Sequence, residues 1–573
     1  MKTGAQCIID GLKRQGVKTI FGLPGGSVLD IFSELYHSSL EFVLVRHEQG
    51  AAHMADGYAR ATGKVGCCLV TSGPGATNTV TGLATAAMDG IPMVCISGQV
   101  PSSMIGNDAF QEADTTGITR AVTKHNYLVR NADDLPRTIA EAFYVARSGK
   151  PGPVLIDVPK DVQRASTDKT TPKELSFRGY RPAFEGNSKQ IARLAEAINK
   201  AARPLLYVGG GVIAGDASRE LIALARKARI PVTTTLMGLG AFPETDPLSL
   251  RMLGMHGSVA ANRAVSECDL LISVGARFDD RVTGKISEFA TAAKKAHIDI
   301  DPSSIDKSVT VDIPVVGHAK PVLQKLLPLV DKGGHREWLA SVNAWMKEFP
   351  FSYDTKSSQL LPQYVIEQVY ELTRGKAIIT TEVGQHQMWA AHFFKYTKPR
   401  TFLSSGGLGT MGYGLPAAIG AQFGKRDALV VDIGGDGSTQ MNFQELVVAV
   451  EHDLPIKVVI LNNGHLGMVR QWQEMFYKGE YSASVLKTTG RNRVENIPDG
   501  KPGQYLPDFV KLAEAHGAVG MRVTRQSEVK SALKKAFSTP RPVVLDCVVS
   551  ENANVYPMVP PGASLIEMVH SMA

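Results

Sequence analysis

Cysteine is scarce in this sequence, and long apolar runs are absent from it. The 573 residues include six cysteines and no CxxC pair, which argues against a disulfide framework or a zinc site of paired thiols. No uncharged stretch approaches the roughly 20 apolar residues of a membrane-spanning helix. Asp10, Lys13 and Arg14 interrupt the start of the chain, so we expect no signal peptide. These absences predict a protein of the reducing cytoplasm that is not bound to a membrane.

A strong excess of one charge is also lacking. Lys and Arg number 62 against 55 Asp and Glu, and the net charge of +7 is spread along the chain. Basic residues alternate with acidic ones, so the sequence predicts no nucleic-acid surface. A composition of 44% hydrophobic and 20% charged residues is typical of globular proteins. A chain of this length is expected to form about three domains.

Short apolar runs alternate with helical patterns over most of the chain, which predicts parallel α/β sheets. Residues 165–187 are polar and contain two prolines, so we expect a linker there. Residues 331–356 are charged and read as a helical connector. We therefore predict three doubly wound parallel-sheet domains, followed by a C-terminal tail. Their expected ranges are residues 1–165, 188–330 and 360–550, with the tail at residues 551–573.

The clearest chemical signal lies between residues 429 and 472. One apolar run ends in the sequence GGDG, which contains Asp436, and a helical pattern separates it from a second run that ends at Asn463. Strands that are neighbours in a parallel sheet place their carboxyl ends together, so Asp436 and Asn463 should lie side by side. Their oxygens suit Mg²⁺, and the glycines allow a diphosphate to approach the backbone. Either GDG or Asn462-Asn463 alone would more often be a turn. The distance from Asp436 to Asn463, however, spans one helix and one strand, the length of a single crossover unit.

Several segments together resemble the large, catalytic subunits of the acetolactate synthase family, which use thiamine diphosphate (ThDP). Besides GDG and NN, they are GLPGG, RHEQGAAHMADGYAR, TSGPGATN, DAFQEAD and KPGPVLIDVPKD. The resemblance covers nearly the whole chain. It implies that pyruvate is decarboxylated on ThDP and that the hydroxyethyl group is transferred to pyruvate or 2-oxobutyrate. The products would be 2-acetolactate or 2-aceto-2-hydroxybutyrate, in the first common step of valine, leucine and isoleucine biosynthesis.

Glu48 follows an apolar strand pattern and opens a helix, so by itself it could be a first-turn acid favoured by the helix dipole. The resemblance implies instead that its carboxylate binds the aminopyrimidine ring of ThDP and drives proton removal from C2. It further implies ThDP contacts at Gly25, Gly26, Asn78, Val383, Gly384, Gln385, His386, Gly409, Met411, Gly435, Asp436, Gly437, Ser438, Asn463, Leu466, Gly467 and Met468. The implied Mg²⁺ ligands are Asp436, Asn463 and the backbone carbonyl of His465.

Other catalytic roles are also carried over from the family. The resemblance implies that Phe110 and Gln111 line the substrate pocket and that Lys160 lies near its entrance. It implies that Arg281 binds the carboxylate of the second 2-oxoacid. Met411 would hold ThDP bent, and Trp472 would favour 2-oxobutyrate as the acceptor. Judged alone, each could be a packing or loop residue, and Arg281 could form an ion pair with Asp279 or Asp280. A rigid guanidinium does suit a planar carboxylate.

The middle third predicts a second Rossmann-like domain with several glycine-rich turns, although no GxGxxG fingerprint is present. A nucleotide fold without a ligand stays open on this pattern alone. The segments LGMHG, GARFDDRVTG and HIDIDP resemble the FAD-binding segments of the family. The implied FAD contacts are Lys150, Gly209, Gly210, Gly211, Leu236, Met255, His256, Gly257, Gly275, Arg277, Asp279, Arg281, Asp299, Ile300 and Asp312. Lys150 stands where the family usually has arginine.

The resemblance also implies a homodimer or homotetramer, with ThDP between the first domain of one subunit and the third domain of another. It leaves open a small regulatory subunit. Residues 485–505 depart from the family as a polar insert. Competing hypotheses are an FAD-dependent pyruvate oxidase, a 2-oxoacid decarboxylase, or a non-catalytic FAD-binding scaffold. The segments RFDDR and MVRQW argue against the first two, and Glu48 argues against glyoxylate carboligase.

Overall fold

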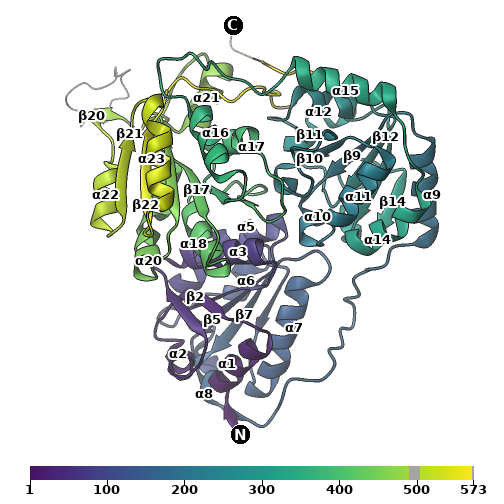
Figure 1. Cartoon of the computed structure of the whole chain (residues 1–573). Coiled ribbons are helices and arrows are strands. Elements are labelled where there is room, and N and C mark those ends of the chain that lie inside the picture. Colours follow the sequence, from purple (N-terminus) through teal and green to yellow (C-terminus); the bar gives the residue numbers. More distant parts are fainter. Residues whose placement is uncertain (490–503, 571–573) are drawn as a thin grey trace.

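Three parallel six-stranded sheets, each flanked by helices, form the chain in the computed structural model (Figure 1). The structure describes residues 1–489 and 504–570. Both faces of the first sheet carry a separate apolar core, as buried parallel sheets require. The predicted fold class, three doubly wound α/β domains, is confirmed. We propose residues 1–165, 188–330 and 360–550 as the domain boundaries, because each sheet falls within one of these ranges.

The N-terminal sheet has the strand order β3-β2-β4-β5-β7-β6, and all neighbouring strands are parallel. Its strands are β2 (Thr19–Leu23), β3 (Glu41–Leu44), β4 (Gly66–Val70), β5 (Met93–Gln99), β6 (His125–Leu128) and β7 (Pro153–Pro159). Its main helices are α1 (Gly4–Arg14), α2 (Leu29–Tyr36), α3 (Glu48–Thr62), α5 (Val80–Asp89), α7 (Leu135–Arg147) and α8 (Lys160–Arg164). The winding direction reverses between β2 and β4, so their carboxyl ends flank a crevice suited to ligands.

The C-terminal sheet repeats this winding order, as β16-β15-β17-β18-β22-β21. Its strands are β15 (Ile378–Thr381), β16 (Phe402–Leu403), β17 (Val430–Gly435), β18 (Lys457–Asn462), β21 (Val519–Val523) and β22 (Val543–Val548). Helices α16 (Pro362–Thr373), α17 (Gln385–Phe393), α18 (Gly414–Gly424), α21 (Gly467–Phe476), α22 (Phe509–Ala515) and α23 (Gln526–Ser538) surround it. Here the reversal lies between β15 and β17, directly at the GGDG sequence.

The central sheet is wound differently, in the order β11-β10-β9-β12-β13-β14. Its strands are β9 (Pro204–Val208), β10 (Val232–Thr234), β11 (Ser249–Met252), β12 (Leu270–Val274), β13 (Lys294–Asp299) and β14 (Ile313–Val316). Numbered within the domain, this is the 3-2-1-4-5-6 order of dinucleotide-binding folds. The reversal between β9 and β12 brings the glycine-rich turns after these strands to one edge.

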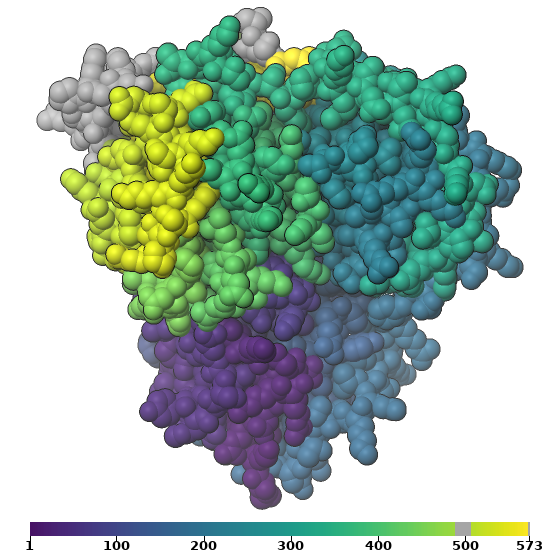
Figure 2. Space-filling view, in the orientation of Figure 1, coloured from purple at the N-terminus to yellow at the C-terminus, as the bar shows by residue number. Residues whose placement is uncertain are grey.

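Helices α3 and α18 join the N- and C-terminal domains, which lie in direct contact (Figure 2). A Cβ on Gly57 of α3 would lie 2.6 Å from the Ala417 Cα, and one on Gly420 of α18 would lie 2.8 Å from the Met54 Cα. Side chains of both helices share one buried core. Glycine at these two positions therefore allows the two backbones to approach closely.

The single helix expected between β17 and β18 is broken into three pieces. They are α19 (Asp436–Thr439), the 3₁₀ helix η7 (Gln440–Glu445) and α20 (Leu446–Glu451). The backbone of Asn442 is non-helical, with φ −133°, and its amide donates to the Gly412 carbonyl at 2.7 Å. This contact ties the segment to the loop before α18. Met441 of η7 is 54% exposed, whereas Leu446 of α20 is buried.

The connecting segments largely follow the sequence pattern. Residues 168–187 contain no helix or strand, and the charged connector forms α15 (Arg336–Glu348). All six cysteines are buried free thiols. No helix built from the described residues combines the length and apolar character needed to cross a bilayer. Most of the insert predicted at residues 485–505 lies outside the described part of the chain.

Candidate active site

Glu48 occupies the first helical position of α3 and is only 6% exposed. The residue before it, His47, caps the helix, because its ring accepts the Gln49 N–H at 3.1 Å. Positive partial charge at a helix N-terminus stabilises a carboxylate in this place. The Asn78 amide donates to Glu48 Oε2 at 2.9 Å. The other oxygen, Oε1, makes no hydrogen bond to the described residues and is available to a ligand.

The turns after β2 and β4 surround this carboxylate. Lys160, which opens α8, donates to the Gly26 carbonyl at 2.9 Å. Gly73 lies against the backbone of Gln111, whose φ is +58°, and Phe110 beside it is 88% exposed. The predicted N-terminal residues thus gather at one edge of the sheet. We call them the Glu48 cluster: Gly25, Gly26, Glu48, Asn78, Gln111 and Lys160.

Asp436 lies at the carboxyl end of β17 and is buried. Burial raises the pKa of this carboxyl to about 7, although backbone N–H groups of Gly464 and Gly437 act in the opposite direction. Its Oδ2 is buried without a hydrogen-bond partner in the described residues. A buried carboxylate oxygen with no partner is costly unless a cation or donor joins it. The position therefore fits a metal ion.

Close contacts bring the other predicted residues together around Asp436. A Cβ on Gly435 would lie 2.5 Å from His386 Nδ1. The Asn463 amide donates to the Gln385 side-chain oxygen at 3.3 Å. We call this set the Asp436 cluster: Val383, Gly384, Gln385, His386, Gly435, Asp436, Gly437, Ser438, Asn463, His465, Leu466, Gly467 and Met468. The structure brings them together at the carboxyl edge of β15, β17 and β18.

The ligand set for a metal at this edge would contain one carboxylate, that of Asp436, as is common for Mg²⁺. Among the described residues, no group of three or more His, Cys, Asp or Glu side chains could hold a metal. Asn463 follows β18, and the next residue, Gly464, directs its backbone N–H at the Asp436 carboxyl, so this turn adjoins Asp436. Amide and backbone oxygens are ligands that Mg²⁺ accepts. The donors at hand therefore match a hard cation and not zinc.

A cavity of about 580 Å³ opens beside the Asp436 cluster, at the junction of all three domains. Volumes of this size hold nucleotide-like ligands. The predicted flavin residues that line it are Lys150, Gly209, Gly210, Gly211, Leu236, Met255, His256, Gly275, Arg277, Asp279, Arg281, Asp299 and Ile300. Val383, Gly384, Gly409, Met411, Met468 and Trp472 of the C-terminal domain line the same cavity. It thus connects the flavin segments to the Asp436 cluster.

Two predicted flavin contacts lie elsewhere. Gly257 packs against the backbone of Leu253 in the turn before α12 (Val259–Glu267) and is not part of the cavity wall. Asp312 precedes β14, at the end of the sheet opposite the cavity, and its carboxylate accepts the Lys295 N–H at 2.8 Å. The assignment of Asp312 to the flavin site is therefore not supported. The residues that β14 delivers to the cavity are Gly317 and His318, at its carboxyl end.

Sequence reasoning also missed other residues of the cavity wall, among them Asp89, Arg147, Thr235, Met237, Gln387, Ser405 and Gly406. For Thr235, Met237, Gly317 and His318 a signal existed. Each follows a central strand, so the rule that ligands bind beyond carboxyl ends would have selected them. Asp89 ends a helix and offered no such signal.

Arg281 and Trp472 meet at the mouth of the cavity. The Arg281 Cζ lies 5.7 Å from the centroid of the Trp472 ring, a cation–π distance. Its ion pair with Asp280 is long, at 3.9 Å, and exposed, so it does not hold the guanidinium firmly. Met411 lines the same cavity. A cationic group and a large ring therefore flank the space in front of Met411.

The two clusters are separate within one chain. Glu48 does not line the cavity described above, and no hydrogen bond or ion pair of the described residues joins it to Asp436 or Asn463. Each cluster lies at the crevice of its own sheet. Among the described residues, no direct polar contact therefore links the two clusters.

Family comparisons match the chain in three consecutive parts. The family models are described as thiamine pyrophosphate enzyme N-terminal TPP binding domain (residues 2–118), central domain (residues 191–326) and C-terminal TPP binding domain (residues 382–547). An acetolactate synthase large subunit of Corynebacterium glutamicum is 49% identical, over 100% of this chain and 90% of its own. One from Haemophilus influenzae is 45% identical, over 99% and 98% respectively. The acetolactate synthase isozyme 3 large subunit of Escherichia coli is 46% identical, over 99% and 98%.

Proposed function

The chain belongs to the family of acetolactate synthase large subunits, which are thiamine pyrophosphate enzymes, and on this premise we propose that it makes acetohydroxy acids. It decarboxylates pyruvate and joins the remaining two-carbon unit to pyruvate or 2-oxobutyrate. The products are 2-acetolactate and 2-aceto-2-hydroxybutyrate, precursors of the branched-chain amino acids. The observation that carries the proposal is identity of 45–49% over essentially the whole chain to relatives of that name.

Glu48 is the proton-handling residue of this proposal. Its free Oε1 accepts the ring N–H of the aminopyrimidine, while Asn78 holds Oε2 in place. Burial strengthens such a hydrogen bond, because little water competes for the carboxylate. When bound, ThDP supplies the nucleophilic carbon and the electron sink for decarboxylation.

Asp436, Asn463 and the His465 carbonyl would hold Mg²⁺ in this proposal, and the metal would supply positive charge for binding the diphosphate. The unpartnered Oδ2 of Asp436 supports this assignment. Gly435 and Gly437 let the backbone approach the phosphates, since neither has room for a side chain. The remaining residues of the Asp436 cluster, with Gly409, form the walls of the diphosphate site.

FAD is assigned to the cavity of about 580 Å³ at the carboxyl edge of the central sheet. Glycine turns after β9 and β12 are suited to its diphosphate, and Arg277 and Lys150 supply positive charge. Asp299, the last residue of β13, is placed to accept from ribose hydroxyls. We assign this cofactor a structural role.

Substrate recognition is assigned to residues at the mouth of the cavity. Arg281 binds the carboxylate of the acceptor 2-oxoacid, and Trp472 beside it narrows the space for the acceptor side chain. Met411 supports the bent cofactor from below. Gln111 and Lys160 reach this space from the Glu48 cluster of a second subunit.

Assembly follows from the separation of the two clusters. Each complete site combines the Glu48 cluster of one subunit with the Asp436 cluster of another, in a homodimer or homotetramer. The large-subunit names of the relatives support a small regulatory subunit as a further partner. A cytoplasmic location stays a prediction.

Cofactor extraction and product analysis test the proposal together. We expect the purified protein to contain FAD and ThDP, and to convert pyruvate to acetolactate only when Mg²⁺ is present. Acetaldehyde as the main product would indicate a decarboxylase, and acetyl phosphate or acetate with reduction of oxygen would indicate an oxidase. FAD without bound ThDP would indicate a non-catalytic scaffold.

A further inference from the structure

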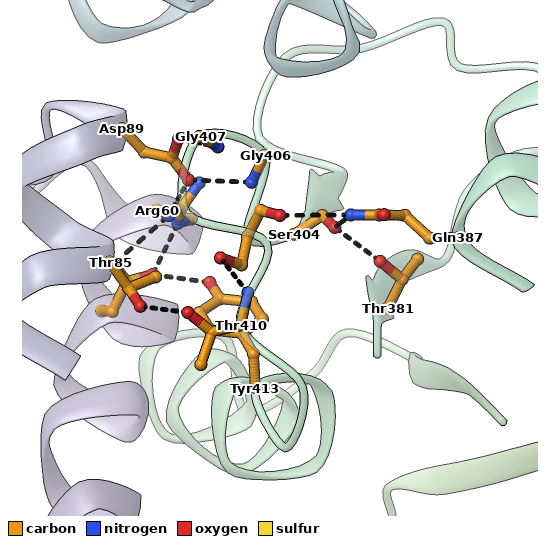
Figure 3. A network of polar contacts seen from close by, with 12 residues as sticks. Arg60, Thr85, Asp89, Thr381, Gln387, Ser404, Gly406, Gly407, Thr410 and Tyr413 are labelled. Atoms are coloured by element: carbon orange, nitrogen blue, oxygen red, sulfur yellow. Dashed lines mark hydrogen bonds and ion pairs between the residues drawn. The ribbon is translucent and has the colours of Figure 1, made fainter. Parts of the chain in front are cut away.

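A loop of the C-terminal domain, residues 404–412, carries Met411 and is held by the N-terminal domain (Figure 3). We call it the Met411 loop. It contains four glycines and follows the short strand β16, so its own sequence offers little to fix its course. Its position must come from contacts with other segments.

Asp89, the last residue of α5, supplies the main contact. The Gly407 N–H donates to Asp89 Oδ1 at 2.8 Å, and the Gly406 N–H donates to Oδ2 at 3.1 Å. A second contact joins the hydroxyls of Thr85 and Thr410 at 2.7 Å. Figure 3 shows these groups pointing across the domain boundary. One carboxylate thus binds two consecutive backbone amides of the loop.

This carboxylate is poorly placed for the stability of its own helix. It stands at the C-terminus of α5, where the helix dipole disfavours negative charge. It is also buried, with a side chain only 1% exposed. A charge in such a place must be compensated by partners, and the loop amides are two of them. Burying the Asp89 carboxylate therefore costs stability, and its hydrogen bonds to the loop amides offset part of this cost.

Arg60 of α3 completes the compensation. Its guanidinium donates to Asp89 at 2.8 Å and to Asp56 at 2.5 Å, and the Tyr413 hydroxyl donates to Asp56, also at 2.5 Å. Tyr413 directly follows the Met411 loop. The network therefore fixes both ends of the loop to the helix that begins with Glu48.

The central domain closes the third side. A Cβ on Gly407 would lie 2.6 Å from the Arg277 guanidinium, and the Met237 side chain fills the space beside Gly406. Arg277 and Met237 therefore support the loop from the central domain at Gly406 and Gly407. On the side of the N-terminal domain, the contacts with Asp89 and Thr85 fix the position of the Met411 loop.

We propose that Asp89 is a positioning residue that sets the height of Met411 beneath ThDP, by holding the amides of Gly406 and Gly407. This inference rests on the proposed function, because it gives Met411 its role as the support of the cofactor. Loss of the carboxylate lets the loop relax, and Met411 would then no longer support bound ThDP for proton removal from C2.

The test replaces Asp89 by asparagine, which keeps the shape but can no longer accept from both amides and pair with Arg60. In FAD- and ThDP-saturated protein we expect the exchange rate of the ThDP C2 proton to fall about 10- to 100-fold. We expect kcat to fall in parallel, with a smaller change in the KM for pyruvate. Amide hydrogen exchange in peptides covering residues 404–413 should accelerate, because the donors lose their acceptor.

Asp508→Asn is the matched control. Asp508 also accepts two backbone N–H groups, of Val510 and Lys511, and pairs with Arg522 at 2.6 Å, but it lies at the exposed start of α22. The rate of ThDP C2 proton exchange in Asp508→Asn should equal that of the wild type. If Asp89→Asn does not fold, Thr85→Val removes the second anchor alone and should slow C2 exchange in the same direction.

A C2 exchange rate in Asp89→Asn within twofold of the wild type would overturn the inference, whatever the amide exchange shows. The same holds for Thr85→Val if it is the only variant obtained. Absence of acetolactate formation in the wild type would refute the proposed function instead. The C2 and amide exchange rates would still decide whether Asp89 positions the cofactor.

Discussion

Buried carboxylates in this protein differ in whether their oxygens are all occupied. Both oxygens of Asp89 have donors, and its charge is shared with Arg60. Glu48 and Asp436 each keep one oxygen without a hydrogen bond from the described residues. An occupied carboxylate holds structure together, whereas a free oxygen is ready for a ligand. Glu48 and Asp436 are therefore available to a ligand in a way that Asp89 is not.

Replacing Glu48 by glutamine tests the binding role. Glutamine keeps the contact with Asn78 but provides no charge to draw the aminopyrimidine proton. We expect acetolactate formation to fall about 100-fold or more. Thermal stability and flavin absorbance should stay unchanged, since neither depends on the free oxygen. The measurement is the initial rate of acetolactate formation at saturating ThDP.

The exposed pair of Glu196 with Lys200 provides the control, because Glu196→Gln makes the same chemical change on the surface of α9 (Ser188–Lys200). It should keep full activity. Wild-type rates in Glu48→Gln would exclude the proposed role.

At the scale of helices and strands, the main contact is the packing of α3 on α18, because small residues on the facing sides of these helices join two domains. Gly420→Ala is expected to lower stability by roughly 1–3 kcal/mol. Its new Cβ would fall within the van der Waals radius of the Met54 carbonyl oxygen, a backbone atom that cannot rotate away. The midpoint of thermal or urea unfolding measures the effect. Gly334→Ala, where a Cβ meets nothing within 4 Å, should change stability by less than about 0.5 kcal/mol.

Glu445 makes the start of α3 sensitive to pH. Its carboxylate accepts the Arg46 N–H at 3.1 Å, but burial raises its pKa from 4.5 to about 7. The folded state therefore holds a proton that the unfolded chain releases between pH 4.5 and 7. The resulting stabilisation is complete below pH 4.5 and is lost as the pH rises through 7.

Glu445→Gln removes this dependence, since glutamine can accept the same N–H without a charge. We expect the variant to gain stability relative to the wild type between pH 5 and pH 8, by up to roughly 3 kcal/mol. Thermal melts at the two pH values measure it. A difference between variant and wild type that does not change with pH would rule out the assignment.

The sequence patterns predicted which residues carry the chemistry better than they predicted the geometry of these helices and strands. Glu48 and Asp436 could be found because strand patterns end directly before them, and such ends form ligand edges. Asp312 was proposed from the family resemblance alone, and the structure places it before β14, where its carboxylate accepts the Lys295 N–H. The break at Asn442 depends on a long-range contact with Gly412, which no local pattern encodes. Asp89 gave no signal for the same reason.

At the level of the whole molecule, the separation of the two clusters leads to a test of assembly. We expect Glu48→Gln and Asp436→Asn to be inactive when expressed alone. Mixed dimers would hold one site with both native residues, so co-expression should restore about a quarter of wild-type activity for random pairing. The assay is acetolactate formation by the whole co-expressed mixture, purified through one tag that both variants carry. No recovery would place a complete site within one chain.

The first and last sheets share one unusual winding order, β3-β2-β4-β5-β7-β6 and β16-β15-β17-β18-β22-β21. Independent origin of two identical six-strand topologies in one polypeptide demands more coincidence than copying of a single ancestral gene segment. After such a duplication, each copy could specialise at the same crevice, one for proton chemistry and the other for anchoring a phosphate. The modern enzyme would then descend from a self-associating protein whose two identical crevices faced each other.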